Sequence, residues 1–132
     1  MKNSFFDDLY RAPGAAVLQR LEDGFPTEAF QSLAGRLELT TKALASALGL
    51  NDRTLRNRTK HLTGDESERS FRAYRVFRRA TEVLGDEGAA RLWMITPQIA
   101  LGQKKPIELL VRDVGAENVL NVLAGIDDGG YL

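Results

Sequence analysis

The chain of 132 residues contains no cysteine, a single histidine and a single tryptophan. Without cysteine it forms neither a disulfide nor a thiolate metal site, which agrees with a reducing compartment. No apolar run approaches the roughly 18–20 residues of a membrane span. The opening segment, MKNSFFDDLYR, lacks the apolar centre of a signal peptide and carries two early aspartates. These absences predict a cytoplasmic protein that does not enter a membrane.

The groupings of side chains that catalysis and metal binding require are also missing. His61, the lone histidine, follows Lys60 near the expected end of a helix, where a capping or surface role fits it and a DNA-phosphate contact is the alternative. No nucleophile and acid accompany it as in a catalytic triad, and no second histidine or cysteine as in a zinc site. We therefore expect a protein that is not an enzyme, with no catalytic residue, no metal site and no cofactor.

The composition is that of an ordinary soluble protein, with 43% hydrophobic and 27% charged residues. Its length suits one domain or two small helical lobes. The formal net charge is zero, but the charges are unevenly distributed. Residues 51–80 hold nine Lys/Arg against four Asp/Glu, whereas residues 81–132 hold four against eight. The first of these segments favours a polyanionic partner and the second repels one.

Apolar residues recur with helical periodicity through most of the chain, and the alternation typical of strands is absent, so we expect an all-α fold. The expected helices are one over residues 15–21 stopped by Gly24, one opened by Pro26 and Thr27, two within residues 41–60, a long one from the Thr63–Glu66 capping box to Leu84, a short one from Asp86 to about Trp93, starts at Pro97 and Pro106, and a last one over residues 116–123 broken by Gly125. We place the domain boundary before the long helix. An N-terminal helix-turn-helix domain of residues 1–62 would then precede a compact helical domain of residues 63–132 with a flexible C-terminal tail.

The segment from 41 to 60, TKALASALGLNDRTLRNRTK, has the pattern of two helices around a tight turn. Ala45 lets the helices approach, Gly49 takes the left-handed turn, and Leu55 anchors the second helix in the core. Thr40 or the threonine after it caps the first helix, and Asn51 caps the second. The remaining inner positions are Leu44, Leu48 and Leu50. This pattern of residues predicts a helix-turn-helix.

The outer face of the second motif helix offers cations and amides that reach phosphates and base edges. The predicted DNA-binding residues are Asn51, Arg53, Thr54, Arg56, Asn57 and Lys60. Asp52 stands beside the arginines, and the total charge is zero. A purely structural or dimerising role for the motif is therefore the alternative to DNA binding.

The long helix carries an aromatic stripe and an arginine stripe. The aromatic stripe, which we expect in the core, consists of Phe71, Tyr74 and Phe77. On the opposite side, Glu68 is spaced to pair with Arg72, and Glu82 is spaced to pair with Arg78. Arg75 and Arg79 have no carboxylate at helical spacing in this interpretation. Their candidate partners are an acidic protein, the acidic C-terminal segment and water.

A series of short motifs follows in a fixed order along the chain. The second motif helix reads LNDRTLRNR and precedes LTGDESER, and the long helix ends in Ala80-x-x-Val83-Leu84-Gly85. Behind it stand Ala90-x-x-Trp93, Pro97-x-x-Ala100-Leu101-Gly102, Pro106-x-x-Leu109-Leu110 and the closing Gly-Gly-Tyr-Leu. Over about residues 25–132 this order resembles the Xre-type antitoxins of the RES–Xre toxin–antitoxin systems, whose members include MbcA and ParS.

The resemblance implies partners and a site that periodicity does not reveal. Such antitoxins bind a RES-domain toxin, related in fold to ADP-ribosyltransferases, that depletes NAD. Their C-terminal domain contacts the toxin, here the region 97–113, and their extreme C-terminus enters the NAD pocket. Carried over by position, the toxin-binding tail is Gly129, Gly130, Tyr131 and Leu132. The resemblance further implies a homodimer that binds operator DNA and represses its own promoter.

Two departures and two rival interpretations accompany the resemblance. The first 25 residues match little, and Lys105 precedes Pro106 where a small hydroxyl residue is usual. From the residues alone, an ordinary frayed terminus is the favoured interpretation of the tail. A helix-turn-helix transcriptional repressor with a dimerisation lobe and no toxin partner is the alternative function.

Overall fold

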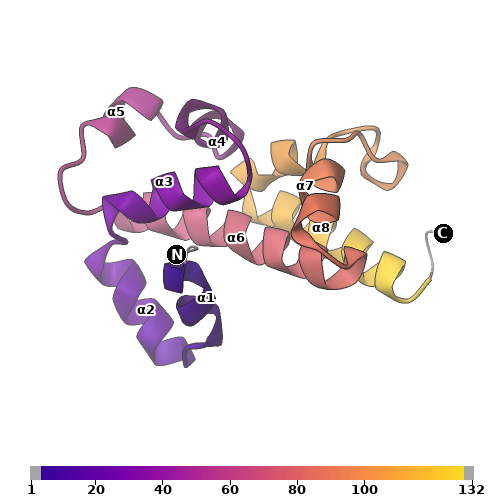
Figure 1. Cartoon of the computed structure of the whole chain (residues 1–132), viewed down its shortest axis with the longest axis horizontal. Coiled ribbons are helices and arrows are strands. Elements are labelled where there is room, and N and C mark those ends of the chain that lie inside the picture. The colour runs from indigo at the N-terminus through magenta and orange to yellow at the C-terminus, as the bar shows by residue number, and fades with distance from the viewer. Residues whose placement is uncertain (1–3, 130–132) are drawn as a thin grey trace. The chain divides into compact units, whose positions relative to one another are not determined.

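The computed structural model describes residues 4–129, and within them the regular elements are helices alone (Figure 1), which confirms the all-α prediction. The elements are α1 (Ser4–Arg11), α2 (Gly14–Asp23), α3 (Thr27–Arg36), α4 (Thr41–Ala47), α5 (Asp52–Arg56), α6 (Gly64–Leu84), α7 (Glu87–Met94), the 3-10 helices η1 (Ile99–Leu101) and η2 (Pro106–Val111), and α8 (Asp113–Asp127). Among these described helices, none combines the length and the apolar character needed to cross a membrane.

The chain divides into two compact units, Met1–Phe71 and Arg72–Leu132, and the division falls inside α6. The first turns of α6 are held by the N-terminal unit. The hydroxyl of Ser67 accepts a 2.8 Å hydrogen bond from the backbone N–H of Phe25, and the Phe25 and Phe71 rings meet edge to face at 6.4 Å. The start of the long helix, where the sequence interpretation ends its first domain, therefore belongs to the core of the first unit.

Helix α1 was not among the predicted helices, and it is an integral part of the first unit. Phe6 and Leu9 are buried, and the Phe5, Phe6 and Phe25 rings pack edge to face with centroids 5.0–5.7 Å apart. Asp7 forms a 3.1 Å ion pair with Arg36 of α3. The opening residues, whose role the sequence left unassigned, thus supply core aromatics.

The chain enters α3 through a close backbone crossing at Gly24. This glycine has φ +83°, and a Cβ on it would lie 2.1 Å from the carbonyl oxygen of Leu62. The neighbouring segments run antiparallel: the N–H of Leu62 donates to Phe25 O at 2.9 Å, and the N–H of Thr27 donates to Lys60 O at 3.0 Å. A side chain at position 24 would prevent this pairing.

The second unit is built on the C-terminal part of α6. Its core contains Tyr74, Phe77, Met94, Leu110, Val119 and Leu123. Asp86 caps α7 through a 2.7 Å bond from Ala89 N–H, as the sequence predicted. The predicted end of the last helix at Gly125 is wrong, since α8 continues to Asp127. One glycine costs a helix only about 1 kcal/mol, and the buried residues of α8 outweigh that cost.

The unusual Lys105–Pro106 junction is capped by another residue. Helix η2 begins at Pro106, and the Glu108 carboxylate accepts a 3.1 Å hydrogen bond from the backbone N–H of Lys105. A second tight contact follows, because a Cβ on Gly115 would lie 2.0 Å from Leu109 O. The passage from η2 into α8 therefore depends on a glycine, as the entry to α3 does.

Candidate functional site

The helix-turn-helix is present, and its local signals act as predicted. Thr40 caps α4 by accepting from Ala43 N–H at 3.0 Å, and Asn51 caps α5 by accepting from Thr54 N–H at 2.9 Å. Gly49 takes the turn with φ +69°. Ala45, Leu44, Leu48 and Leu55 are buried, whereas Leu50 is half-buried. The inner face is thus close to the predicted one.

The second motif helix is shorter than the sequence suggested. α5 ends at Arg56, and Asn57 is its C-cap. Lys60 does not lie on this helix, because its backbone belongs to the segment that pairs with Thr27. The predicted DNA-binding residues therefore come from one helical turn and from the extended segment behind it.

The cations of this segment have different surroundings. Arg53 and Lys60 are exposed and form no ion pair within residues 4–129. Arg56 is 66% exposed, but its Nε lies 3.1 Å from the carboxylate of Asp52, whose side chain is only 20% exposed. The second oxygen of Asp52 is buried without a hydrogen-bond partner in the described part of the chain. An acidic group thus competes for Arg56 at the predicted DNA face.

Arg58, which the sequence counted only as part of the basic block, is used to fix the motif. Its Nη2 and Nε lie 2.9 and 3.2 Å from the carboxylate of Glu66. Glu66 also completes the predicted capping box, accepting from Thr63 N–H at 2.8 Å while its own N–H donates to Thr63 Oγ1 at 3.1 Å. Burial alone raises the pKa of Glu66, but the hydrogen bonds from Arg58 and Thr63 outweigh it and hold the pKa below its ordinary value.

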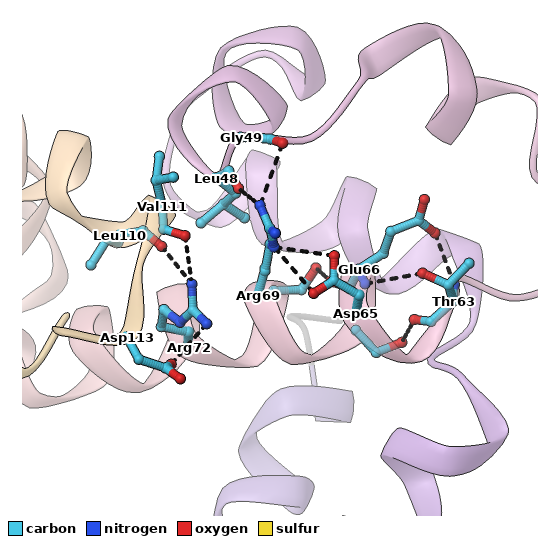
Figure 2. A network of polar contacts seen from close by, with 12 residues as sticks. Leu48, Gly49, Thr63, Asp65, Glu66, Arg69, Arg72, Leu110, Val111 and Asp113 are labelled. Atoms are coloured by element: carbon cyan, nitrogen blue, oxygen red, sulfur yellow. Dashed lines mark hydrogen bonds and ion pairs between the residues drawn. The ribbon is translucent and has the colours of Figure 1, made fainter. Parts of the chain in front are cut away.

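Arg69 is a second positioning residue that sequence reasoning missed (Figure 2). Its Nη1 donates to the carbonyl oxygens of Leu48 and Gly49 at 2.9 and 3.4 Å, and its Nε pairs with Asp65 at 3.2 Å. The turn of the helix-turn-helix is therefore held from α6. The i,i+4 spacing of Asp65 and Arg69 was visible in the sequence, but the backbone partners were not.

In the second unit, Arg72 is not the surface residue that the stripe predicted. Its side chain is 9% exposed, and Nη1 donates to the carbonyl oxygens of Leu110 and Val111, both at 3.0 Å (Figure 2). Its partner is Asp113 at 2.7 Å rather than Glu68. The arginine thus holds the end of η2 and the start of α8, and no local spacing reveals that role.

The remaining arginine pairs follow the sequence more closely. Arg78 pairs with Glu82 at 3.3 Å, as predicted. Arg79 pairs with Asp127 at 3.2 Å, which confirms the acidic C-terminal segment as one of its candidate partners. It also lies 3.6 Å from Glu82, so the statement that it has no carboxylate at helical spacing was wrong.

The C-terminal unit exposes apolar side chains and contains an open groove. Leu92, Ile95, Ile99 and Val114 are the exposed large apolar residues of this unit. A groove of about 540 Å³ is lined by Pro97, Gln98, Ile99, Ala100, Val122 and Ile126. Gly129, the first residue of the predicted tail, is exposed with φ +82°, and Gly130, Tyr131 and Leu132 lie outside the described residues.

Comparison with known proteins assigns both units. Residues 16–73 match the antitoxin Xre-like helix-turn-helix domain, and residues 79–129 match the antitoxin Xre/MbcA/ParS C-terminal toxin-binding domain. A protein of Yersinia enterocolitica named Antitoxin Xre is 30% identical over 122 residues, which cover 89% of this chain and 82% of the relative. An Antitoxin Xre of Pseudomonas putida is 31% identical over 113 residues, covering 83% of this chain and 70% of the relative.

The two matched domains coincide with the helix-turn-helix in the first unit and with most of the second unit. They cover most of the chain and leave out the segment that contains α1. The chain belongs to the Xre antitoxins, a non-enzymatic family that joins a helix-turn-helix domain to a toxin-binding domain.

Proposed function

We propose that this protein neutralises a RES-domain, NAD-depleting toxin in the cytoplasm, and that its C-terminal tail enters the toxin active site. The observation that carries the proposal is the match of residues 79–129 to a toxin-binding domain. The RES class comes from the motif order that resembles the RES–Xre antitoxins. The tail would block access to NAD by occupying space, so the antitoxin needs no chemistry of its own.

The end of α8 supports this role for the tail. The helix stops at Asp127, and the two following residues are exposed. At Gly129 the backbone takes a positive φ, which only glycine adopts at little cost, so the helical conformation ends before this residue. In the sequence, Tyr131 adds an aromatic ring with a polar tip, which suits an anchor in a narrow pocket.

The tail is tested by deleting residues 129–132 and co-expressing the shortened chain with the toxin of the same operon. We expect neutralisation to be lost or strongly weakened, while the circular dichroism spectrum and unfolding midpoint stay unchanged. Arg53→Ala/Arg56→Ala is the matched control, since it alters the other unit and should protect as well as the parent chain. Full protection by the shortened chain would remove the tail from the mechanism.

We also propose that the first unit binds operator DNA as a homodimer and represses its own operon. Arg53 and Lys60 support this, because they are exposed cations without an ion pair in the described part of the chain. Arg58 and Arg69 support it indirectly, since they hold the ends of the motif in place. The other proposed contacts are Thr54 and Arg56, which lie on α5, and its two capping residues, Asn51 and Asn57.

DNA binding is tested by titrating a fluorescent promoter fragment at several salt concentrations. With about six to eight phosphate contacts per dimer, the log–log salt slope should lie near −5 to −7. Arg53→Ala/Arg56→Ala should abolish specific binding, and the tail deletion should leave it intact. Unchanged affinity of the arginine variant would favour the structural role of the motif, and sedimentation would measure the dimer separately.

A further inference from the structure

The loop between α7 and η2 is held rigidly by its own backbone. The N–H of Gln98 donates to Lys104 O at 3.0 Å, and the N–H of Gln103 donates to Gln98 O at 2.8 Å. The Gln98 side chain adds bonds to the carbonyl oxygens of Trp93 and Thr96 at 3.2 and 2.9 Å. Closing the loop requires left-handed backbone at both 102 and 103. These bonds restrain the loop in this conformation.

This loop presents Ile99 to solvent. The residue is 84% exposed, more than any other large apolar residue among those described. Leu92 and Ile95, three residues apart at the end of α7, are also exposed and face one side of that helix. Because the backbone that carries Ile99 is already ordered, covering this side chain requires no ordering of the loop.

Ile99 also forms one wall of the groove described above, and α8 forms the other. Val122 and Ile126 contribute the α8 wall, and Pro97 and Ala100 continue the loop wall. The volume of about 540 Å³ is within the range of ligand pockets, and the lining is apolar apart from Gln98. The groove is therefore large enough to receive a bulky apolar side chain of another protein.

We infer that Ile99 and this groove are the apolar anchor of the toxin interface: the toxin receives Ile99 in a pocket of its own and inserts an apolar side chain between the loop and α8. The inference rests on the proposed function. All groove residues lie within the matched toxin-binding domain. The α8 wall also leads directly into Gly129, so a toxin that holds the tail has its surface next to the groove.

The charge of the segment that follows α6 adds a condition on the toxin surface. Residues 81–132 carry eight acidic and four basic side chains, whereas the whole unit, with its four arginines from α6, is neutral. A toxin that surrounds its apolar anchor with lysine or arginine would be attracted to this segment, to which all the groove residues belong, and guided onto the groove. The partner chemistry is thus an apolar patch with a cationic rim.

The test compares Ile99→Glu with Val114→Glu in the full-length chain. Val114 is 68% exposed on α8 in the same unit but does not line the groove, so it controls for the added charge. Calorimetric titration against the toxin of the same operon should show at least a tenfold weaker Kd for Ile99→Glu and a change of less than about threefold for Val114→Glu. Ala100→Trp, which fills the groove, should weaken binding in the same direction.

The outcomes separate this inference from the proposed function. If the parent chain binds the toxin and Ile99→Glu binds equally well, the anchor is overturned while the antitoxin role stands. If the parent chain shows no binding, the proposed function itself fails. If Ile99→Glu instead dissociates a dimer in sedimentation and leaves toxin affinity unchanged, Ile99 joins two copies of this chain and the inference is also overturned.

Discussion

Each unit has an arginine of α6 that binds backbone carbonyl oxygens, and the two arginines differ in burial. In each, an arginine of α6 donates to two successive backbone carbonyl oxygens and pairs with one carboxylate. Arg69 serves the turn of the helix-turn-helix and remains 27% exposed, whereas Arg72 serves the end of η2 and is 9% exposed. Water can replace a lost donor more readily at the first site than at the second.

The comparison indicates that similar hydrogen bonds contribute differently to the free energy of unfolding, depending on how buried they are. An exposed carbonyl regains most of a lost bond from solvent, while a buried one bears the full desolvation cost of about 1–3 kcal/mol. We therefore expect the first unit to tolerate adjustment at the turn that positions its proposed DNA face. We expect the second unit to tolerate less at the junction of η2 and α8, because this junction positions α8, which forms one wall of the groove.

The largest expected effects come from the two crossing glycines. Gly24→Ala would place Cβ 2.1 Å from Leu62 O and force alanine to φ +83°, so unfolding should become easier by about 3–5 kcal/mol. Gly115→Ala meets Leu109 O at 2.0 Å without a positive φ, and should cost about 1–3 kcal/mol. Urea denaturation measures both.

Gly35→Ala is the control for this pair, because no atom lies within 4 Å of its Cβ position in α3. It should stabilise the protein by roughly 0.5–1 kcal/mol, since alanine favours helix over glycine. Equal costs at positions 24 and 115 would show that close approach alone, and not backbone conformation, limits these sites.

The next largest difference should separate Arg72 from Arg69. Arg72→Ala leaves the carbonyl oxygens of Leu110 and Val111 without their donor and should destabilise the protein by about 3 kcal/mol. Arg69→Ala should cost only about 1 kcal/mol, because solvent reaches the turn. Arg72→Met keeps the apolar stem and isolates the loss of the guanidinium. Costs within about 0.5 kcal/mol of each other would contradict the role assigned to burial.

Sequence reasoning succeeded where a structure depends on neighbours a few residues apart. Each predicted cap joins residues three apart, such as Asn51 with Thr54 and Asp86 with Ala89, so the pattern lies within one turn of helix. The two carbonyl oxygens that accept from Arg72 lie 38 and 39 residues away in the sequence. Every residue has a backbone carbonyl, so the amino-acid type at these positions does not indicate the contact.

Two errors in helix assignment have a related cause. Helix α1 is held by aromatic packing against Phe25 and by the ion pair of Asp7 with Arg36. The sequence of its eight residues does not indicate these contacts. Gly125 is a helix-breaking signal that the packing of α8 overrides. In both cases tertiary contacts, which local pattern does not contain, decide whether the helix forms.

A smaller effect should appear as a pH dependence of the first unit. The pKa of Glu66 lies below its ordinary value of 4.5, so its contribution to stability is present above that pH and is lost as the pH falls through the lowered pKa. Glu66→Gln should therefore cost about 1–2 kcal/mol at pH 7 and progressively less below pH 4.5.

Asp113→Asn provides the matching measurement in the second unit. Its carboxylate is 73% exposed although its partner Arg72 is buried, and an exposed ion pair contributes less than about 1 kcal/mol. The unfolding free energy of both variants is measured by urea titration from pH 3 to pH 7. A constant difference between Glu66→Gln and the parent chain over this range would show that Glu66 acts only through its shape.

The smallest expected effect concerns DNA affinity. Asp52 holds Arg56 by a 3.1 Å pair on the face proposed to meet DNA, and its own charge repels phosphate. Asp52→Asn should free the guanidinium and tighten promoter binding about threefold to tenfold, with a salt slope steeper by about one unit per subunit. Asp65→Asn is the control, because it removes an exposed carboxylate that pairs with Arg69 rather than with Arg56. Weaker binding by Asp52→Asn would mean that the carboxylate positions Arg56 for DNA instead of withholding it, and toxin affinity should be unchanged in either case because the altered residue belongs to the first unit.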